Sequence, residues 1–296
     1  MHHALLTVAL LCAGQELEPR RWTHLPVGTN IAGAGYLYTD ADLDFEPALR
    51  IDDTELVLHT ILASYNRYFG LLERTARLDV RVPFHYGVWE GLLNGEPATV
   101  RRDGLSDPVI RFSLSFVGAP ALEGEEFQAY RKEHEDRTVI GAGLALRVPL
   151  GEYMDDKLIN LGENRFTLEP QLGAVHYLGP WSFELTGSVS LYTANDDFFD
   201  GRRLEQDPLY ALQAHVVRSF EPGLWVAAGA AYGHAGETEI NGAGLDDERG
   251  RLLYGVSAGF SAASTHAFRV GYLRQESFRR LGGDAHTLLL SWAIVF

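Results

Sequence analysis

The C-terminal stretch from His286 to Phe296 constrains the fold most, because its side chains alternate between two faces. One face carries mostly large apolar side chains, namely His286, Leu288, Leu290, Trp292, Ile294 and Phe296, and the other carries Thr287, Ser291 and Ala293. A period of two is the geometry of a β-strand with one apolar side. An edge strand of a soluble sheet would also alternate, but an uncovered apolar edge invites aggregation, so we favour a strand that faces lipid.

The same design recurs along the chain and is clearest between Arg74 and Trp89. There Leu78, Val80, Val82, Phe84, Tyr86 and Val88 alternate with Asp79, Arg81, Pro83, His85 and Gly87, so one face suits lipid and the other suits water. Polar, glycine-containing breaks separate about twelve such runs, an even number as in single-chain bacterial barrels. We therefore predict an all-β fold: a transmembrane, antiparallel, up-and-down β-barrel of about 12 strands.

The breaks between these runs alternate in length. Long breaks lie at residues 40–53, 90–107, 151–164, 195–207 and 236–250, and short ones lie near Gly70, Gly179, Gly223 and Ser264. Long external loops and short periplasmic turns are typical of outer-membrane barrels. The exception is the break at 118–137, which is long where a short one is expected; its core at 125–135 predicts a short polar helix at the periplasmic rim.

Aromatic residues gather at or near the ends of the predicted strands. Membrane barrels carry aromatic girdles at both membrane interfaces. We assign to these girdles Trp89, Trp181, Tyr210, Trp225, Tyr272 and Trp292. The terminal Phe296 and Trp292 also resemble the C-terminal assembly signal of bacterial outer-membrane barrels, which predicts a role for these two residues in assembly.

Charge and composition exclude two other classes. Outside the N-terminus, no wholly apolar run approaches the ~18 residues that a membrane-spanning helix needs. The formal net charge of −15 makes nucleic acid an improbable partner, because phosphate binding needs a basic surface. The acidic residues concentrate in segments such as 40–46, 196–197 and 246–248, which we interpret as solvated loops; divalent-cation bridging to anionic lipid is the sharper alternative.

The N-terminus predicts export. Residues 4–13 form an apolar run, and small residues near Gly14 suit cleavage before Gln15, so we expect a signal peptide at 1–14 and a single domain at 15–296. Cys12 is the only cysteine, and a lipoprotein signal would need a small residue where Leu11 stands. The mature chain would then contain neither disulfides nor thiolate metal sites.

Residues 104–122, followed by Phe127 and Tyr130, resemble a bacterial family named for a MetA pathway of phenol degradation. Supporting stretches lie at 76–83 and 147–153, and the similarity extends over nearly all of the mature chain. The resemblance implies an outer-membrane β-barrel that passes small, often aromatic or hydrophobic, compounds. It implies no catalytic residues.

No enzymatic constellation stands out in the sequence, so we expect no catalytic residues, no cofactor and no metal. The pattern Gly-Val-Ser-Ala-Gly at 255–259 matches an esterase nucleophile elbow, but it lies inside an alternating strand and no helical pattern follows it. The histidines are scattered, without paired metal-ligand spacing. His85 and His215 fall on predicted lumen faces, where either could act as an acid or base or simply line a wet wall.

Charged side chains on the inward faces give the most informative pattern. A basic residue on the lipid face at mid-depth costs ~2–4 kcal/mol, so these residues belong in the lumen. Arg81, Arg111 and Arg147 should face Glu169 near mid-height, either as ion pairs that brace the wall or as a constriction that selects solutes by charge. The full set of predicted lumen residues is Asp79, Arg81, His85, Arg111, Arg147, Glu169, Gln171, Glu184, His215 and Arg269.

Two function classes remain. The first is a passive outer-membrane channel for small, aromatic or hydrophobic, molecules; the second is a non-transport barrel that acts as a lipid- or ester-modifying enzyme or as a surface scaffold. The inward faces carry polar and small side chains but no assembled nucleophile and base, which favours the channel. We expect a monomer whose partners are outer-membrane lipid and lipopolysaccharide, the barrel assembly machinery and small-molecule solutes.

Overall fold

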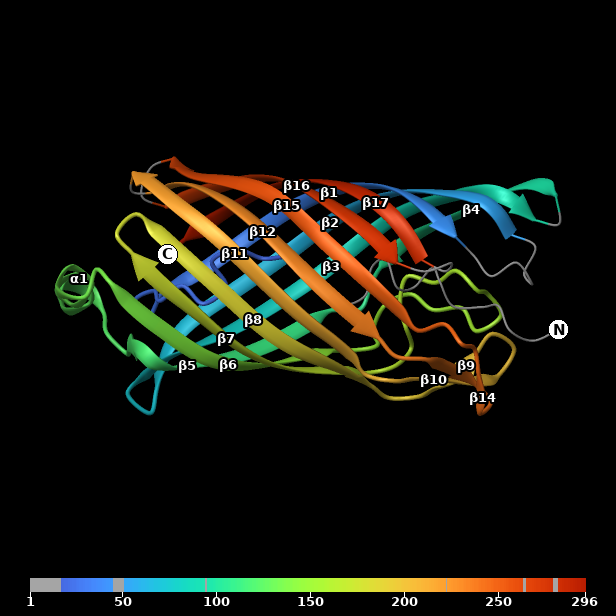
Figure 1. Ribbon diagram of the computed structural model, residues 1–296, viewed down its shortest axis with the longest axis horizontal. Helices are drawn as coiled ribbons and strands as arrows, with labels where there is room; N and C mark the ends of the chain where they lie inside the picture. Colours follow the sequence, from blue (N-terminus) through green and yellow to red (C-terminus); the bar gives the residue numbers. More distant parts are fainter. Residues whose placement is uncertain (1–16, 45–50, 94, 222, 263–264, 279–281) are drawn as a thin grey trace.

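The computed structural model describes residues 17–44, 51–93, 95–221, 223–262, 265–278 and 282–296, and within them it forms a closed antiparallel β-barrel (Figure 1). The barrel closes because β1 (Asn30–Asp44) pairs with both β2 (Ile51–Leu71) and β17 (Gly282–Val295). The other strands of the ring are β3 (Arg74–Leu93), β5 (Val109–Pro120), β6 (Arg137–Arg147), β7 (Thr167–Leu178), β8 (Trp181–Tyr192), β11 (Leu209–Glu221), β12 (Leu224–Ala235), β15 (Arg249–Ala262) and β16 (His266–Phe278).

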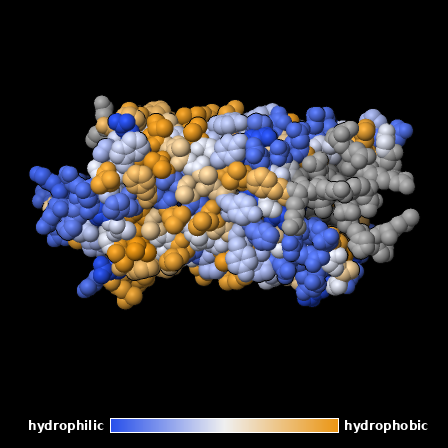
Figure 2. Space-filling model, viewed as in Figure 1, coloured by the Kyte–Doolittle hydropathy of each residue, from blue (hydrophilic) through white to orange (hydrophobic). Residues whose placement is uncertain are grey.

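Twelve strands therefore make the ring among the described residues, and they are the twelve that the alternation predicts. The fold class is confirmed. In the last strand, Leu288, Leu290 and Trp292 are 55%, 57% and 43% exposed on the outside of the barrel. Figure 2 shows hydrophobic residues gathered over the barrel, between a hydrophilic end that carries the helix and a hydrophilic end that carries the long loops.

The connections at the two ends differ as expected. At one end, here called the turn end, tight turns join neighbouring strands, for example Leu71 to Arg74 and Leu178 to Trp181. Asn30 and Phe296 exchange backbone hydrogen bonds of 2.8 and 2.9 Å at the same end. The turn end also carries α1 (Gly124–Glu133), which confirms the predicted helix. It begins with acidic and ends with basic side chains, as the helix dipole favours, and buries Phe127.

The opposite end, here called the loop end, carries longer connections and a small second sheet. This sheet consists of β9 (Asn195–Phe198), β10 (Arg202–Gln206), β13 (Thr238–Ile240) and β14 (Ala243–Gly244). Its apolar core contains Phe198, Leu204, Ile240 and Leu245. One connection there is short, because β16 ends at Phe278 and β17 begins at Gly282.

Two predicted loops at this end are wrong, because the strands extend into them. Residues 40–44 belong to β1, and residues 90–107 contain the end of β3 and the strand β4 (Glu96–Leu105), which pairs with β3. The period of two continues there: Ala41 and Leu43 are buried, whereas Asp40 and Asp42 face outward. Outward acids replace outward apolar residues because these strand ends project beyond the apolar belt. The pair Asp196 and Asp197 likewise lies in β9 rather than in a loop.

Two of the predicted girdle residues point inward. Trp89 is 4% exposed and packs in a core with Leu43, Leu56 and Leu161, while Trp225 points into the barrel, where the guanidinium of Arg20 lies 5.4 Å from its ring. The remaining assigned aromatics, Trp181, Tyr210, Tyr272 and Trp292, are exposed on the outside. Among the described residues, no helix is long and apolar enough to cross a membrane.

The closing seam can be tested with a disulfide. Thr39 of β1 and Thr287 of β17 are register partners whose hydroxyl oxygens lie 2.9 Å apart. In a Cys12→Ser background, the variant Thr39→Cys/Thr287→Cys should therefore oxidise to an intramolecular disulfide that joins the first and last strands. Boiled samples should then migrate differently on gels with and without reductant. The control Thr39→Cys/Ser291→Cys moves the second cysteine four positions along β17 and should show no such bond; oxidation of the control alone would contradict the register.

Candidate functional site

The lumen of the barrel contains the segment Leu17–Thr29, here called the lumen segment, which precedes β1 (Figure 1). At its inner end Leu17 is buried and packs against Ala231 and Leu253 of the barrel wall. Its other end reaches the turn end, where the Gly28 amide donates to the Tyr68 carbonyl at 2.9 Å. Polypeptide, rather than the side chains of the strands alone, thus fills the middle of this barrel.

Trp22 anchors the lumen segment in a recess made by two glycines. Its ring packs over Gly141 of β6 and Gly173 of β7; a Cβ added at Gly141 would lie 2.7 Å from the ring, and one added at Gly173 would overlap it. The indole Nε1 donates a hydrogen bond of 2.8 Å to the hydroxyl of Thr186. A buried tryptophan with its N–H satisfied gains from both apolar burial and the hydrogen bond.

His24 fixes the lumen segment to the helix at the turn end. Its Nε2 donates to the Pro120 carbonyl at 2.9 Å, and its ring meets Phe127 of α1 edge-on at 4.9 Å between centroids. Burial lowers the pKa of His24 to about 4, so the ring is neutral at neutral pH. A neutral imidazole suits this mostly apolar contact better than a charged one would.

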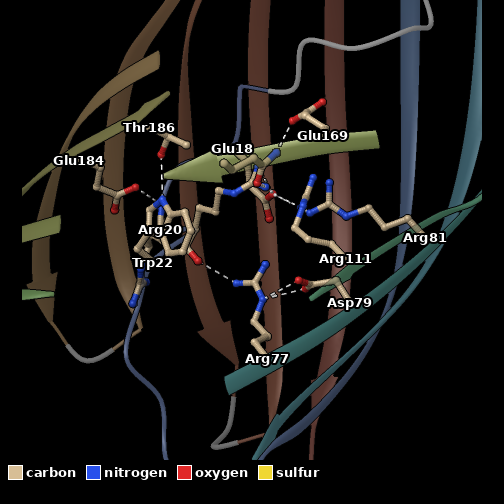
Figure 3. A network of polar contacts seen from close by, with 12 residues as sticks. Glu18, Arg20, Trp22, Arg77, Asp79, Arg81, Arg111, Glu169, Glu184 and Thr186 are labelled. Carbon is tan, nitrogen blue, oxygen red and sulfur yellow. Dashed lines mark hydrogen bonds and ion pairs between the residues drawn. The ribbon is translucent and has the colours of Figure 1, made fainter. Parts of the chain in front are cut away.

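Glu18 is the electrostatic centre of the lumen (Figure 3). One of its carboxylate oxygens lies 2.6 Å from Nη2 of Arg81 on β3 and 3.7 Å from Nη1 of Arg111 on β5. Arg21 of the lumen segment itself lies 4.0 Å from the same oxygen. Burial raises the pKa of Glu18, but the neighbouring arginines outweigh that effect and hold it well below its ordinary value. Glu18 therefore stays ionised at neutral pH.

A second set of contacts ties the lumen segment to both sides of the barrel. On β3, Nε of Arg77 binds Asp79 at 2.8 Å and its Nη1 donates to the Arg21 carbonyl at 2.9 Å. On the opposite side the Arg20 amide donates to Glu184 at 2.7 Å, and the Arg21 guanidinium donates to the side-chain oxygen of Gln171. The segment thus bridges β3 and β5 to β7 and β8.

The predicted lumen residues fall into two groups. Asp79, Arg81, Arg111, Gln171 and Glu184 lie in the network around the lumen segment. Glu169 joins this network, because it accepts hydrogen bonds from Gln171 and Ser190 (Figure 3). His85, Arg147, His215 and Arg269 lie elsewhere on the inner wall: His85 bonds Thr60 at 2.7 Å, and His215 covers Gly229. Arg147 and Arg269 line cavities.

Among the described residues, the lumen contains cavities beside and beyond the lumen segment. One of them, the turn-side cavity of about 320 Å³, is lined by Glu18, Arg269 and Leu289 among others. The loop-side cavity of about 220 Å³ is lined by Leu58, His85 and Arg147 among others. Four residues, Leu37, Leu62, Arg81 and Leu273, line both of these cavities. A small third cavity of about 40 Å³ is lined by Arg111, Arg147 and Glu169 among others.

The lumen segment is the functional element that the sequence reasoning missed. Residues 15–24 read as a polar lead without a periodic pattern, so neither Glu18 nor Trp22 stood out. The signal that could have indicated it was a tryptophan among charged residues directly after a predicted cleavage site, together with glycines on inward strand faces. Neither clue says that Trp22 meets Gly141 and Gly173, because that contact depends on long-range strand pairing.

At the loop end, the connection between β6 and β7 folds over the lumen. The Asp107 carboxylate accepts hydrogen bonds of 2.8 Å from the amides of both Gly151 and Glu163, and Ser106 donates to the Leu161 carbonyl at 2.7 Å. Leu161 in turn packs against the inward residues Leu56 and Trp89. This connection is therefore pinned across the opening rather than projecting from it.

The glycine recess generates a prediction. Gly173→Val should displace Trp22, because the new side chain needs the space of the indole ring. The lumen segment should then become accessible, so trypsin should cut purified, detergent-solubilised protein at Arg20 or Arg21 faster than it cuts the parent. Gly187→Val is the matched control, since a Cβ at Gly187 meets nothing closer than 4.0 Å. Equal protection of all three proteins would show that the recess does not hold the segment.

Comparisons with known proteins place these features in context. The chain is similar to the COG4313 outer membrane channel from Pseudomonas putida F1, with 24% identity over 95% of this chain and 100% of the other and a TM-score of 0.78. It is also similar to the beta domain of the Bordetella autotransporter BrkA, with 11% identity over 90% of this chain and 100% of the other and a TM-score of 0.51.

A third similar structure is a deletion mutant of the TodX monoaromatic hydrocarbon channel, with 10% identity over 92% of this chain and 90% of the other and a TM-score of 0.50. At these identities the three structures support the fold. No protein with a curated function matches. Residues 29–285 match the family described as "Putative MetA-pathway of phenol degradation", and the chain belongs to this family.

Proposed function

We propose that the protein is a passive outer-membrane channel for small hydrophobic or aromatic molecules. The observation that carries this proposal is the pair of cavities inside a closed barrel, lined on one side by Leu37, Leu58, Leu62 and Leu273. An apolar inner lining next to an apolar outer belt suits solutes that leave water readily. The outer belt itself suits insertion in a membrane, because it presents leucine and aromatic side chains where lipid would lie.

Two of the similar structures support the same class of function. One is an outer membrane channel and another is a monoaromatic hydrocarbon channel. We infer that this chain likewise lies in the outer membrane, with its loop end outside and α1 in the periplasm, as is usual for barrels with long external loops. The proposed export signal at 1–14 lies outside the described residues.

A barrel enzyme or scaffold fits the site less well. The stretch at 255–259 lies within β15 and pairs with both β12 and β16. A nucleophile elbow instead places its serine on a sharp turn between a strand and a helix. We therefore propose that Ser257 is a small inward residue of the wall, and that the protein is not an enzyme.

The roles of the charged lumen residues and of the C-terminus extend the proposal. We propose that Arg81, Arg111 and Arg147, with Glu169, set the charge preference of the passage. We also propose that Trp292 and Phe296 form the signal read by the barrel assembly machinery; Phe296 is 65% exposed at the seam between first and last strands. Lipid and lipopolysaccharide would surround a monomer.

An uptake experiment tests the channel. Cells that express the protein should take up labelled toluene several-fold faster than cells with an empty vector, whereas liposomes that contain it should admit sugars no faster than empty liposomes. Leu273→Asp places a carboxylate between the two cavities and should reduce toluene uptake, because a charge disfavours an apolar solute there. The control Leu72→Asp changes a leucine that is 79% exposed in the turn between β2 and β3. Equal toluene uptake with and without the protein would contradict the proposal.

A further inference from the structure

The turn-side and loop-side cavities are lined by both leucines and arginines. Leucines of β1, β2, β16 and β17, namely Leu37, Leu58, Leu62, Leu273 and Leu289, form an aliphatic strip along them. Arginines stand beside this strip at successive heights: Arg147 in the loop-side cavity, Arg81 where the two cavities meet, and Arg269 in the turn-side cavity. Such a surface is complementary to a molecule with an apolar body and an anionic head.

Arg81, in the middle of this series, binds a carboxylate of the chain itself. Arg81 lines both cavities and binds Glu18 at 2.6 Å, and Glu18 itself lines the turn-side cavity. The ionised side chain of Glu18 thus lies beside an aliphatic strip, at the point through which a solute would pass from one cavity to the other. Arginine binds carboxylates through charge-assisted hydrogen bonds whatever molecule carries them.

We propose that the preferred solutes are small hydrophobic monocarboxylates, and that the solute carboxylate replaces that of Glu18 on Arg81 during passage. This inference rests on the proposed function and names its substrate class. The apolar part of the solute lies on the leucine strip while its carboxylate takes the place of Glu18. The exchange keeps a carboxylate beside Arg81 throughout, so the lumen segment can yield while that arginine retains a carboxylate contact.

The size of the cavities limits the solute. The loop-side cavity has a volume of about 220 Å³ and the turn-side cavity about 320 Å³, at or below the ~300–1,000 Å³ of sites for drug-sized ligands. A single aromatic ring or a short aliphatic chain suits this space. Benzoate represents the aromatic monocarboxylates and octanoate the aliphatic ones.

Because Glu18 occupies Arg81, a free carboxylate should bind the parent protein only weakly. A group tethered on the same chain competes at an effective concentration in the millimolar range or above. Glu18 is held in addition by Trp22 and by the contacts of Arg20 and Arg21. A free carboxylate therefore binds the parent only at high concentration, and loss of the Glu18 charge should strengthen its binding.

Calorimetric titration of the detergent-solubilised protein tests this inference. Glu18→Gln should bind benzoate about tenfold or more tightly than the parent, since no tethered carboxylate then competes with benzoate for Arg81. Glu18→Gln/Arg81→Gln should lose that gain, and it removes both charges together, which protects folding. Benzamide, the neutral analogue, should bind all variants equally. Arg203→Gln is the matched control, because Arg203 is exposed in the small sheet at the loop end.

The outcomes separate the inference from the proposed function. Benzoate binding that is unchanged by Glu18→Gln, or a gain that survives the loss of Arg81, overturns the carboxylate exchange. Octanoate in place of benzoate tells which apolar body fits: a gain for octanoate alone supports aliphatic acids, and a gain for benzoate alone supports aromatic ones. Toluene uptake by cells tests the channel independently. Faster toluene uptake together with benzoate binding that is the same in all variants refutes only the inference. Toluene uptake that the protein does not change refutes the channel.

Discussion

The balance of charge inside the barrel is the constraint on which the rest of this structure depends. A closed wall with lipid outside leaves its inward arginines little water, and buried charges are tolerated only when they are paired. The strands supply Arg77, Arg81 and Arg111 on one side of the lumen, where Asp79 pairs with Arg77. Glu18, carried in by the segment before β1, adds a negative charge beside Arg81 and Arg111.

This pairing determines how the interior is divided. Because Glu18 holds the lumen segment against β3 and β5, the turn-side and loop-side cavities lie along the leucines of β1, β2, β16 and β17. Trp22 and His24 fix the rest of the segment against β6, β7 and α1. A polar network and leucine-lined cavities thus share one lumen, although every strand obeys the same alternation of inward and outward residues.

The sequence predicts the barrel well because one physical rule governs all of its strands. The period of two follows from the pleat, and the outward apolar residues follow from the lipid, so both can be read locally at stretches such as 78–88. The same rule underestimates strand length at Asp40 and Asp42, where the strand leaves the apolar belt and its outward residues become acidic. It also places Trp89 and Trp225 inward, because their neighbours Val88 and Val226 point outward, so a girdle assignment based only on their position near strand ends is wrong.

The lumen is predictable only in part, for the same reason. Alternation places Arg81, Arg111 and Glu184 on inward faces, but it cannot say what they meet. Their partners come from residues 18–22, which have no period and which reach their positions through pairings far apart in the sequence. Glu169 was expected opposite the arginines, and it does share the small cavity with Arg111 and Arg147, whereas the closer contact of Arg111 with Glu18 had no local signal.

The ionic conductance of single barrels in planar bilayers tests the central role of Glu18 most directly. Parent protein should conduct weakly at neutral pH, and Glu18→Gln should conduct more, because the segment loses its charge pairing with Arg81 and Arg111. The pairing holds the pKa of Glu18 below its ordinary value of 4.5, so it is fully present above that pH and is lost as the pH falls through the lower value. Acidification through that lower value should therefore raise the conductance of the parent towards that of Glu18→Gln. Equal conductance of the two proteins at neutral pH, with both correctly assembled, would contradict this account.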